Sequence, residues 1–192
     1  FDKKRDGFIL SEGAGFIFLE EMKHALDRGA NILGEISGYG ITNDAFHITQ
    51  PHSEAVGAIS AIKMALDDSD LNENDIDYIN AHGTSTYFND MLETKAIKKS
   101  FRNKAYDISI SSTKSMTGHL LGAAGAIEAI ICLNSIKEGV IPPTINLNNK
   151  DEDCDLDYTP NKAVEKNVTN TMSNSFGFGG HNSVIIIKKF SS

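Results

Sequence analysis

Two histidines, His82 and His119, each lie in a loop that follows a short apolar run and is rich in glycine and hydroxyl side chains. His82 belongs to the segment AHGTST (residues 81–86) and His119 to the segment STKSMTGH (residues 112–119). In α/β proteins, loops at the carboxyl ends of buried strands carry ligand sites. A neutral imidazole can donate one hydrogen bond, so two imidazoles facing one carbonyl oxygen would stabilise a developing enolate. The two loops therefore predict electrostatic catalysis at a carbonyl group.

Two further features could contribute to such a site. Residues 174–182 (NSFGFGGHN) contain glycines that let the backbone turn sharply and bring amide groups close to a ligand. Lys114 precedes His119 by five residues, so it could lie on the same loop and act on nearby groups through its positive charge. Glu128, in the apolar stretch that follows, is placed to neutralise Lys114.

The chain has no evident nucleophile of its own. Cys132 lies in an apolar helical stretch, where a thiol behaves as a small hydrophobic group. Cys154 is surrounded by acidic residues that disfavour its thiolate. No serine lies in a Gly-x-Ser-x-Gly turn. Neither His82 nor His119 has a second ligand at the short spacing of metal sites, so we expect no catalytic metal.

Composition narrows the classes of function. The 192-residue chain has a formal net charge of −8, and its basic residues are scattered, which argues against nucleic-acid binding. The basic residues of 95–104 have helical spacing, which favours a solvated helix face. No apolar run approaches the roughly 20 residues that span a bilayer, so no membrane segment is predicted. Two unpaired cysteines indicate a reducing compartment, and a first residue other than methionine suggests a fragment.

The elements that would position these loops alternate along the chain. Apolar runs predict strands at residues 15–20, 32–39, 76–81 and 108–112, whereas helical periodicity predicts helices at residues 21–28, 53–68, 89–99 and 123–137. The end of the chain predicts two antiparallel strands, 170–174 and 183–190, joined by the glycine-rich loop. Alternation of this kind is typical of a mainly parallel sheet covered by helices. We expect one α/β domain over residues 1–192.

Five segments together resemble the elongating β-ketoacyl-acyl-carrier-protein synthases, a family of acyltransferases. They are residues 1–8, 81–86, 111–125, 142–146 and 174–182, and they occur in the family's order and spacing. The resemblance covers essentially the whole chain, but family members are about twice as long. It therefore implies that this chain corresponds to the C-terminal half, and that the N-terminal half is absent.

The resemblance implies a thiolase-like fold with stacked α-β-α-β-α layers, to which each half contributes a five-stranded sheet. In the family, a cysteine of the first half accepts an acyl chain from the acyl carrier protein. Malonyl carrier protein is then decarboxylated, and its carbanion attacks the thioester. The resemblance also implies fatty acid biosynthesis in the cytoplasm, a homodimer, and no cofactor besides the phosphopantetheine of the carrier protein. Because the cysteine is absent here, we expect this half alone to be inactive.

Roles carried over from the family fall on matching residues. His82 and His119 correspond to the histidines that, with the cysteine, form the catalytic triad and hold the malonyl thioester carbonyl. Lys114 corresponds to the active-site lysine and Glu128 to its ionic partner. The backbone amide of Phe178 corresponds to part of the oxyanion hole, and its side chain to the gate between the acyl tunnel and the malonyl site.

Three hydroxyl groups complete the implied site. Thr84 and Thr86 correspond to groups that bind the phosphopantetheine arm, and Thr49 occupies a similar position in the preceding loop. Two positions depart from the family pattern. Tyr87 stands where a proline often follows, which puts the rigidity of the loop in question, and His181 stands where many members have threonine.

Three other readings stay open at this stage. The chain could belong to a non-catalytic partner that resembles the chain-length factors of polyketide systems, or to a ketosynthase module of a multidomain polyketide enzyme. A purely structural or binding module is disfavoured because three loops of matching type and order occur together. The resemblance implies that much of the acyl tunnel, and with it the chain-length preference, belongs to the absent half.

Overall fold

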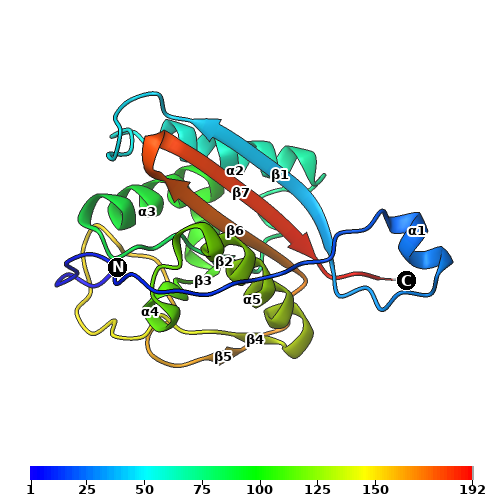
Figure 1. The fold of residues 1–192 in the computed structure, drawn as a ribbon. Coiled ribbons are helices and arrows are strands. Elements are labelled where there is room, and N and C mark those ends of the chain that lie inside the picture. Colours follow the sequence, from blue (N-terminus) through cyan, green and yellow to red (C-terminus); the bar gives the residue numbers. More distant parts are fainter. Residues whose placement is uncertain (192) are drawn as a thin grey trace.

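A mixed five-stranded sheet forms the centre of the molecule (Figure 1). The computed structural model describes residues 1–191. In spatial order, the strands are β1 (Glu35–Asn43), β7 (His181–Lys188), β6 (Asn170–Gly177), β2 (Tyr78–Asn80) and β3 (Ser109–Ser111). A separate antiparallel pair consists of β4 (Val140–Ile141) and β5 (Val164–Glu165).

Four of the five central strands point the same way. β7 pairs antiparallel with both β1 and β6, whereas β2 pairs parallel with β6 and with β3. Strand β7 alone is therefore reversed, because it returns from β6 through a short turn. The predicted α/β class and mostly parallel sheet are confirmed.

Helices cover both faces of this sheet (Figure 1). The longer helices are α2 (Val56–Asp68), α3 (Tyr87–Phe101) and α5 (Ala124–Glu138), and the shorter ones are α1 (Met22–Asp27) and α4 (Lys114–Thr117). Three 3₁₀ turns, η1 (Arg102–Tyr106), η2 (Leu121–Ala123) and η3 (Phe178–Gly180), complete the regular elements. Within residues 1–191, no helix is long and apolar enough to cross a membrane.

The sheet separates two hydrophobic cores because successive strand side chains point to opposite faces. On β7, Val184 and Ile186 pack into the core that contains α2 and α3. Ile187, the next residue along, packs into the second core, which α5 provides with Ala129 and Cys132. β7 therefore contains a continuous apolar run from Val184 to Ile187, as expected of a strand that is covered on both faces.

Helix α2 lies unusually close to β1. Its buried residues recur at the spacing of one helix face, and Gly38 and Gly40 of β1 lie beneath them. A Cβ atom at Gly40 would lie 2.0 Å from the carbonyl oxygen of Ala61. Only glycine, which has no side chain, permits this approach.

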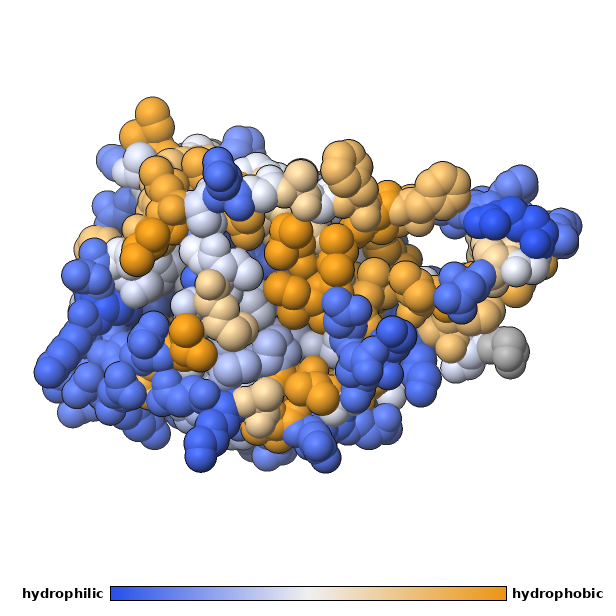
Figure 2. Space-filling view, turned by 60° about the horizontal axis from the view of Figure 1, so that its bottom comes forward, coloured by the Kyte–Doolittle hydropathy of each residue, from blue (hydrophilic) through white to orange (hydrophobic). Residues whose placement is uncertain are grey.

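One predicted strand is wrong. Residues 15–20 run along α5 without joining a ladder among the described residues, and Phe16 and Phe18 are 91% and 84% exposed. Strands form where backbone N–H and C=O groups find a neighbouring strand, and this segment finds none within residues 1–191. Figure 2 shows hydrophobic side chains clustered across the middle of one face of the molecule.

The bounds of the other predicted helices and strands agree with the structure to within a few residues, but some short elements were not predicted. β1 begins at Glu35 rather than at residue 32, and the one-turn helix α4, which begins at Lys114, was not predicted. Lysines 95 and 98 of α3 pair with Glu54 and Asp155, which is consistent with a solvated basic face.

Candidate active site

The register of three parallel strands sets the position of the site. Asn80, the last residue of β2, lies beside Ser111 of β3 and Ser173 of β6. Neighbouring strands are about 4.8 Å apart, so the loops that leave these ends must emerge together. The loop after β2 carries His82, and the loop after β3 carries Lys114 and His119. The predicted convergence of the two loops is confirmed.

The two imidazole rings meet edge to face. Their centroids are 5.6 Å apart and their planes are inclined at 84°. Phe176 of β6 contacts the His82 ring at 5.9 Å between centroids, and Phe8 contacts the His119 ring at 5.1 Å. His82 is buried, whereas His119 is partly exposed. Aromatic neighbours on both sides thus fix the orientation of the pair.

Both histidines are held in their neutral form. Burial, followed by the Lys114 and His119 charges, lowers the pKa of His82 well below its usual value. Burial and then Lys114 lower the pKa of His119. Nδ1 of His119 accepts a hydrogen bond from the Leu121 backbone amide at 3.2 Å, so the proton of the neutral ring resides on Nε2. His119 is therefore a hydrogen-bond donor through Nε2.

A buried carboxylate on α3 fixes the start of the His82 loop. The two oxygens of Glu93 accept hydrogen bonds from the backbone amides of His82 and Gly83, each at 2.8 Å. Asn174 of β6 donates a third at 3.0 Å. Burial raises the pKa of Glu93 and the three donors oppose that rise. Sequence reasoning missed Glu93, because a glutamate within a lysine-rich helix gives no sign of burial.

Lys114 forms a buried ion pair with Glu128 of α5. Their side chains are 4% and 3% exposed, and Nζ lies 2.5 Å from Oε1. Burial raises the pKa of Glu128 to about 7, although the lysine opposes this. Among the described residues, the second carboxylate oxygen of Glu128 has no hydrogen-bond partner. The predicted pairing is confirmed, and it keeps a positive charge close to the two imidazoles.

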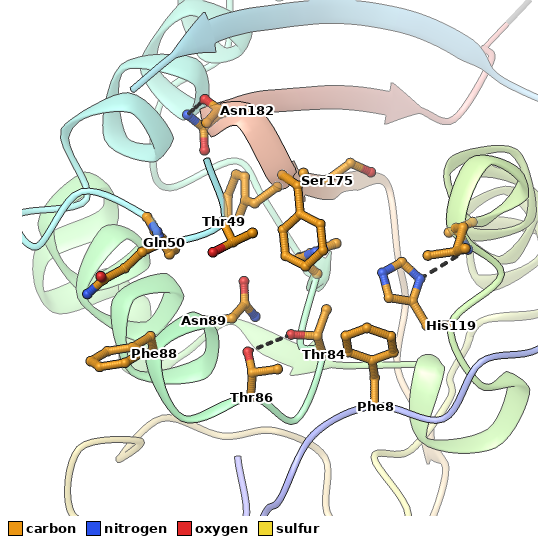
Figure 3. A pocket seen from close by; sticks show the side chains of 18 of the residues that line it. Phe8, Thr49, Gln50, Thr84, Thr86, Phe88, Asn89, His119, Ser175 and Asn182 are labelled. Atoms are coloured by element: carbon orange, nitrogen blue, oxygen red, sulfur yellow. Dashed lines mark hydrogen bonds between the residues drawn. The ribbon is translucent and has the colours of Figure 1, made fainter. Parts of the chain in front are cut away.

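A cavity of about 700 Å³ collects most of the predicted site residues (Figure 3). Its lining includes both histidines and Phe178, together with the three threonines at positions 49, 84 and 86. The hydroxyls of Thr84 and Thr86 are 3.0 Å apart, and Thr49 lies across the cavity from them. Lys114 lines an adjoining cavity that shares Thr84 and His119, whereas Glu128 lies behind it.

The glycine-rich loop of residues 177–181 closes one side of the cavity. Phe178 is 68% exposed, and it is followed by Gly179 and Gly180 with φ of 82° and 79°. Gly179 donates its amide to the Ile48 carbonyl at 2.7 Å, which ties this loop to the one that carries Thr49. The two loops thus form one continuous rim.

The two cysteines lie away from this chemistry. Burial raises the pKa of Cys132 to about 12. The pKa of Cys154 is also raised, and the main cause is burial rather than the surrounding acids that the sequence suggested. Within residues 1–191, no group of three or more histidine, cysteine or acidic side chains could hold a metal ion.

Comparison with known proteins identifies the family. Residues 33–148, more than half of the chain, match the family described as beta-ketoacyl synthase, C-terminal domain. The chain belongs to the beta-ketoacyl synthase family. It is 55% identical over 190 residues to 3-oxoacyl-[acyl-carrier-protein] synthase 2 of Synechocystis sp. (strain ATCC 27184 / PCC 6803 / Kazusa), covering 99% of this chain and 46% of that relative. The beta-ketoacyl synthase chain thus spans about half the length of this curated relative.

Solved structures of ketosynthases have the same thiolase-like fold. One is a complex of a type II PKS acyl-carrier protein with its ketosynthase bound to the hexaketide, with a TM-score of 0.97 and 41% identity over 100% of this chain and 47% of that chain. Another is the ishigamide ketosynthase/chain length factor, with a TM-score of 0.94 and 43% identity over 99% of this chain and 46% of that one. The predicted fold class is confirmed.

Proposed function

We propose that this chain is the C-terminal half of a 3-oxoacyl-[acyl-carrier-protein] synthase 2, which elongates fatty acyl chains by decarboxylative Claisen condensation. One observation carries the proposal: His82 and His119 meet in a cavity with both rings held neutral. Neutral imidazoles donate hydrogen bonds without giving up a full proton, as stabilisation of an enolate oxygen requires. The relatives with the same name support this function.

The reaction begins with an acyl chain carried as a thioester on a cysteine of the upstream half. In the cavity, the malonyl thioester carbonyl accepts hydrogen bonds from His82 and His119. The malonyl carboxylate leaves as CO₂, and the electron pair of the broken C–C bond forms an enolate whose oxygen these donors stabilise. The enolate carbon attacks the acyl thioester carbonyl, and the cysteine thiolate departs.

The remaining residues of the site support these reaction steps. The charge of Lys114 adds to burial in keeping the pKa values of both histidines low, and Glu128 compensates that charge. The backbone amide of Phe178 contributes to the oxyanion hole for the acyl carbonyl, and its side chain gates the acyl site. Thr84, Thr86 and Thr49 bind the phosphopantetheine arm of malonyl carrier protein, because their side chains line the cavity beside the histidines.

The partners of the complete enzyme follow from the same proposal. An acyl carrier protein delivers both substrates, and the structure of a related ketosynthase in complex with its acyl carrier protein supports this partner. The upstream half supplies the cysteine and covers exposed apolar residues such as Phe16 and Phe18. The complete enzyme is a cytoplasmic homodimer without a resident cofactor. An intact mass of the native polypeptide near twice the 20.9 kDa of this chain is expected.

A chain-length-factor role is the second candidate, because one similar structure contains a ketosynthase/chain length factor. In that role the fold is kept and the nucleophile is lost. The neutral histidine pair and the intact Lys114–Glu128 pair favour the catalytic role. A catalytic enzyme has a cysteine in the upstream half, whereas a chain-length factor has none.

The decisive experiment assays the full-length polypeptide for decarboxylation of malonyl carrier protein and for condensation. His82→Ala and His119→Ala are expected to lower kcat by about 10²–10³, the usual effect of removing one oxyanion donor. His24→Ala is the matched control, since His24 is exposed on α1 far along the chain from both loops. Unchanged activity in both cavity variants would refute the proposal.

A further inference from the structure

The side chain of Arg5 is charged and yet only 1% exposed. Its guanidinium lies against the turn that connects β2 to α3. Nε donates to the Thr86 carbonyl oxygen at 3.4 Å, and Nη2 donates to the Tyr87 carbonyl oxygen at 3.1 Å. Arg5 therefore holds the backbone of the turn from which Thr84 and Thr86 reach the cavity.

Other contacts anchor the guanidinium itself. Nη1 donates to the Asp2 carbonyl oxygen at 3.0 Å and to the carboxylate of Asp151. The Asp2 carboxylate in turn accepts the backbone amides of Asn148 and Asn149 at 2.8 and 2.7 Å. Arg5 thus connects three segments that are distant in sequence. Such a network restricts where the guanidinium, and with it the turn, can lie.

The turn requires support of this kind because its backbone is unusual. Ser85 has a φ of 64°, a conformation that residues other than glycine seldom adopt. Its amide donates to Asp90 at 3.1 Å, and its carbonyl oxygen accepts the amide of Gly7 at 2.8 Å. Residues 5–7 therefore donate hydrogen bonds to the carbonyl groups of residues 85–87, while Asp90 accepts the amide of Ser85.

Tyr87 gives Arg5 a second means of contact. Proline at this position would fix its own φ angle and stiffen the start of the helix. A tyrosine provides no such restriction. Its ring instead faces the guanidinium, with Cζ of Arg5 5.2 Å from the ring centroid, within the range of a cation–π interaction. Contacts from Arg5 thus provide the rigidity that a proline at position 87 would otherwise give the turn.

We propose that Arg5 is a positioning residue that sets the affinity of the Thr84–Thr86 turn for the phosphopantetheine arm of malonyl carrier protein. The proposal rests on the proposed function and deepens it. Arg5 lines neither cavity and acts through the carbonyl groups of Thr86 and Tyr87. The loss of Arg5 therefore weakens binding of the arm and leaves the chemistry at the histidines intact.

The test compares two substrates in the full-length enzyme. Malonyl carrier protein presents the whole arm, whereas the malonyl thioester of N-acetylcysteamine lacks most of it. Arg5→Lys retains the buried charge but cannot supply the planar fork of donors. We expect its KM for malonyl carrier protein to rise about tenfold, equivalent to about 1.4 kcal/mol, with kcat within about twofold. The KM for the short thioester should change much less. Arg5→Met should show a larger effect of the same pattern.

Asp77→Asn is the control for a merely structural effect. Asp77 accepts the backbone amides of Thr169 and Asn170 at 2.7 and 3.0 Å and lines no described cavity. It should lower the midpoint of unfolding without changing the ratio of the two KM values. If Arg5→Met does not fold, Arg5→Lys alone decides the result.

Three results would overturn the proposal. In the first, Arg5→Lys raises both KM values equally; in the second, it lowers kcat without changing KM. In the third, Arg5→Lys has the KM and kcat of the wild type. If the wild-type enzyme decarboxylates malonyl carrier protein, this third result refutes only the role of Arg5. A wild-type enzyme without that activity refutes the proposed function as well, so the two failures are distinguishable.

Discussion

The ring of His82 lies edge-on to the ring of His119, with 5.6 Å between their centroids. Protonation of either ring would therefore place a positive charge near the ammonium group of Lys114, and protonation of both rings would place two like charges side by side. Burial is the largest cause of both lowered pKa values, and the positive charge of Lys114 adds to it. Under the proposed function, the same charges relate the rate of decarboxylation to pH.

The first prediction concerns the acid limb of the pH profile. The histidines act in their neutral form, and their lowered pKa values keep them neutral below the ordinary value of about 6.5. We expect kcat/KM for malonyl carrier protein to stay constant as pH falls to about 6.5 and to decline only below it. Lys114→Gln should move this decline to higher pH, since the positive charge no longer opposes protonation. A decline that begins above pH 6.5 in the wild type would contradict the prediction.

The same pKa shift affects stability. The unfolded chain binds a proton at His82 more readily than the folded chain does. The free energy of unfolding is therefore undiminished above the unfolded pKa of about 6.5 and falls as pH drops below it. Urea unfolding of the full-length protein between pH 8 and pH 5 measures this slope, and His82→Asn should reduce it.

The second prediction concerns the buried pair. Lys114→Met leaves the Glu128 carboxylate buried without its partner, which should cost roughly 3–5 kcal/mol at pH 8. The pKa of Glu128, already about 7, should rise further. Because the folded state then retains the proton that the unfolded state releases, stability falls as pH rises, and the loss at pH 6 should be smaller. Adding Glu128→Gln should restore most of the stability at pH 8; a double variant no more stable than Lys114→Met would contradict this account.

The third prediction concerns Glu93. Glu93→Gln replaces one of its two acceptor oxygens with an NH₂ group that faces a backbone amide of residue 82 or 83. We expect a loss of about 1–3 kcal/mol in the free energy of unfolding, typical of an unsatisfied buried donor. The displaced loop should also lower kcat for decarboxylation. Both quantities can be measured on one preparation. A variant with wild-type kcat and reduced stability would show that Glu93 does not affect catalysis.

The fourth prediction tests the close packing of α2 on β1. Gly40→Ala would place a methyl group 2.0 Å from a backbone oxygen of α2, so the helix must shift. Overpacking of this kind costs roughly 1–3 kcal/mol, and we expect the upper end because the obstacle is backbone. Gly122→Ala is the matched control, as nothing lies within 4 Å of the added atom. Thermal unfolding of both variants should show a loss in the first alone.

The sequence predicted the elements whose stability is local or buried on both faces. Helices α2 and α5 are amphipathic or apolar over several turns, and the strands that lead to His82 and Lys114 are short and buried along their whole length. The convergence of the two loops follows from parallel pairing. The resemblance to the family located the same residues independently.

The sequence could not predict features that depend on distant partners. Residues 15–20 have the composition of a strand, but their pairing depends on a neighbour that residues 1–191 do not provide. Burial of Glu93 depends on the position of α3 above the His82 loop, which no local pattern encodes. The anchoring of Arg5 depends on Asp151, which is 146 residues away in sequence and accepts a hydrogen bond from the guanidinium.

His82 lies two residues after the end of β2, whereas the opposite rim of the cavity comes from residues 44–51 and 177–180. His82 is therefore held close to the sheet, and the opposite rim is made of loops. Loops tolerate substitution and insertion far better than paired strands do. Over evolutionary time, such a division lets the shape of the cavity entrance diversify while His82 keeps its position, so that one scaffold can admit ligands of different shape.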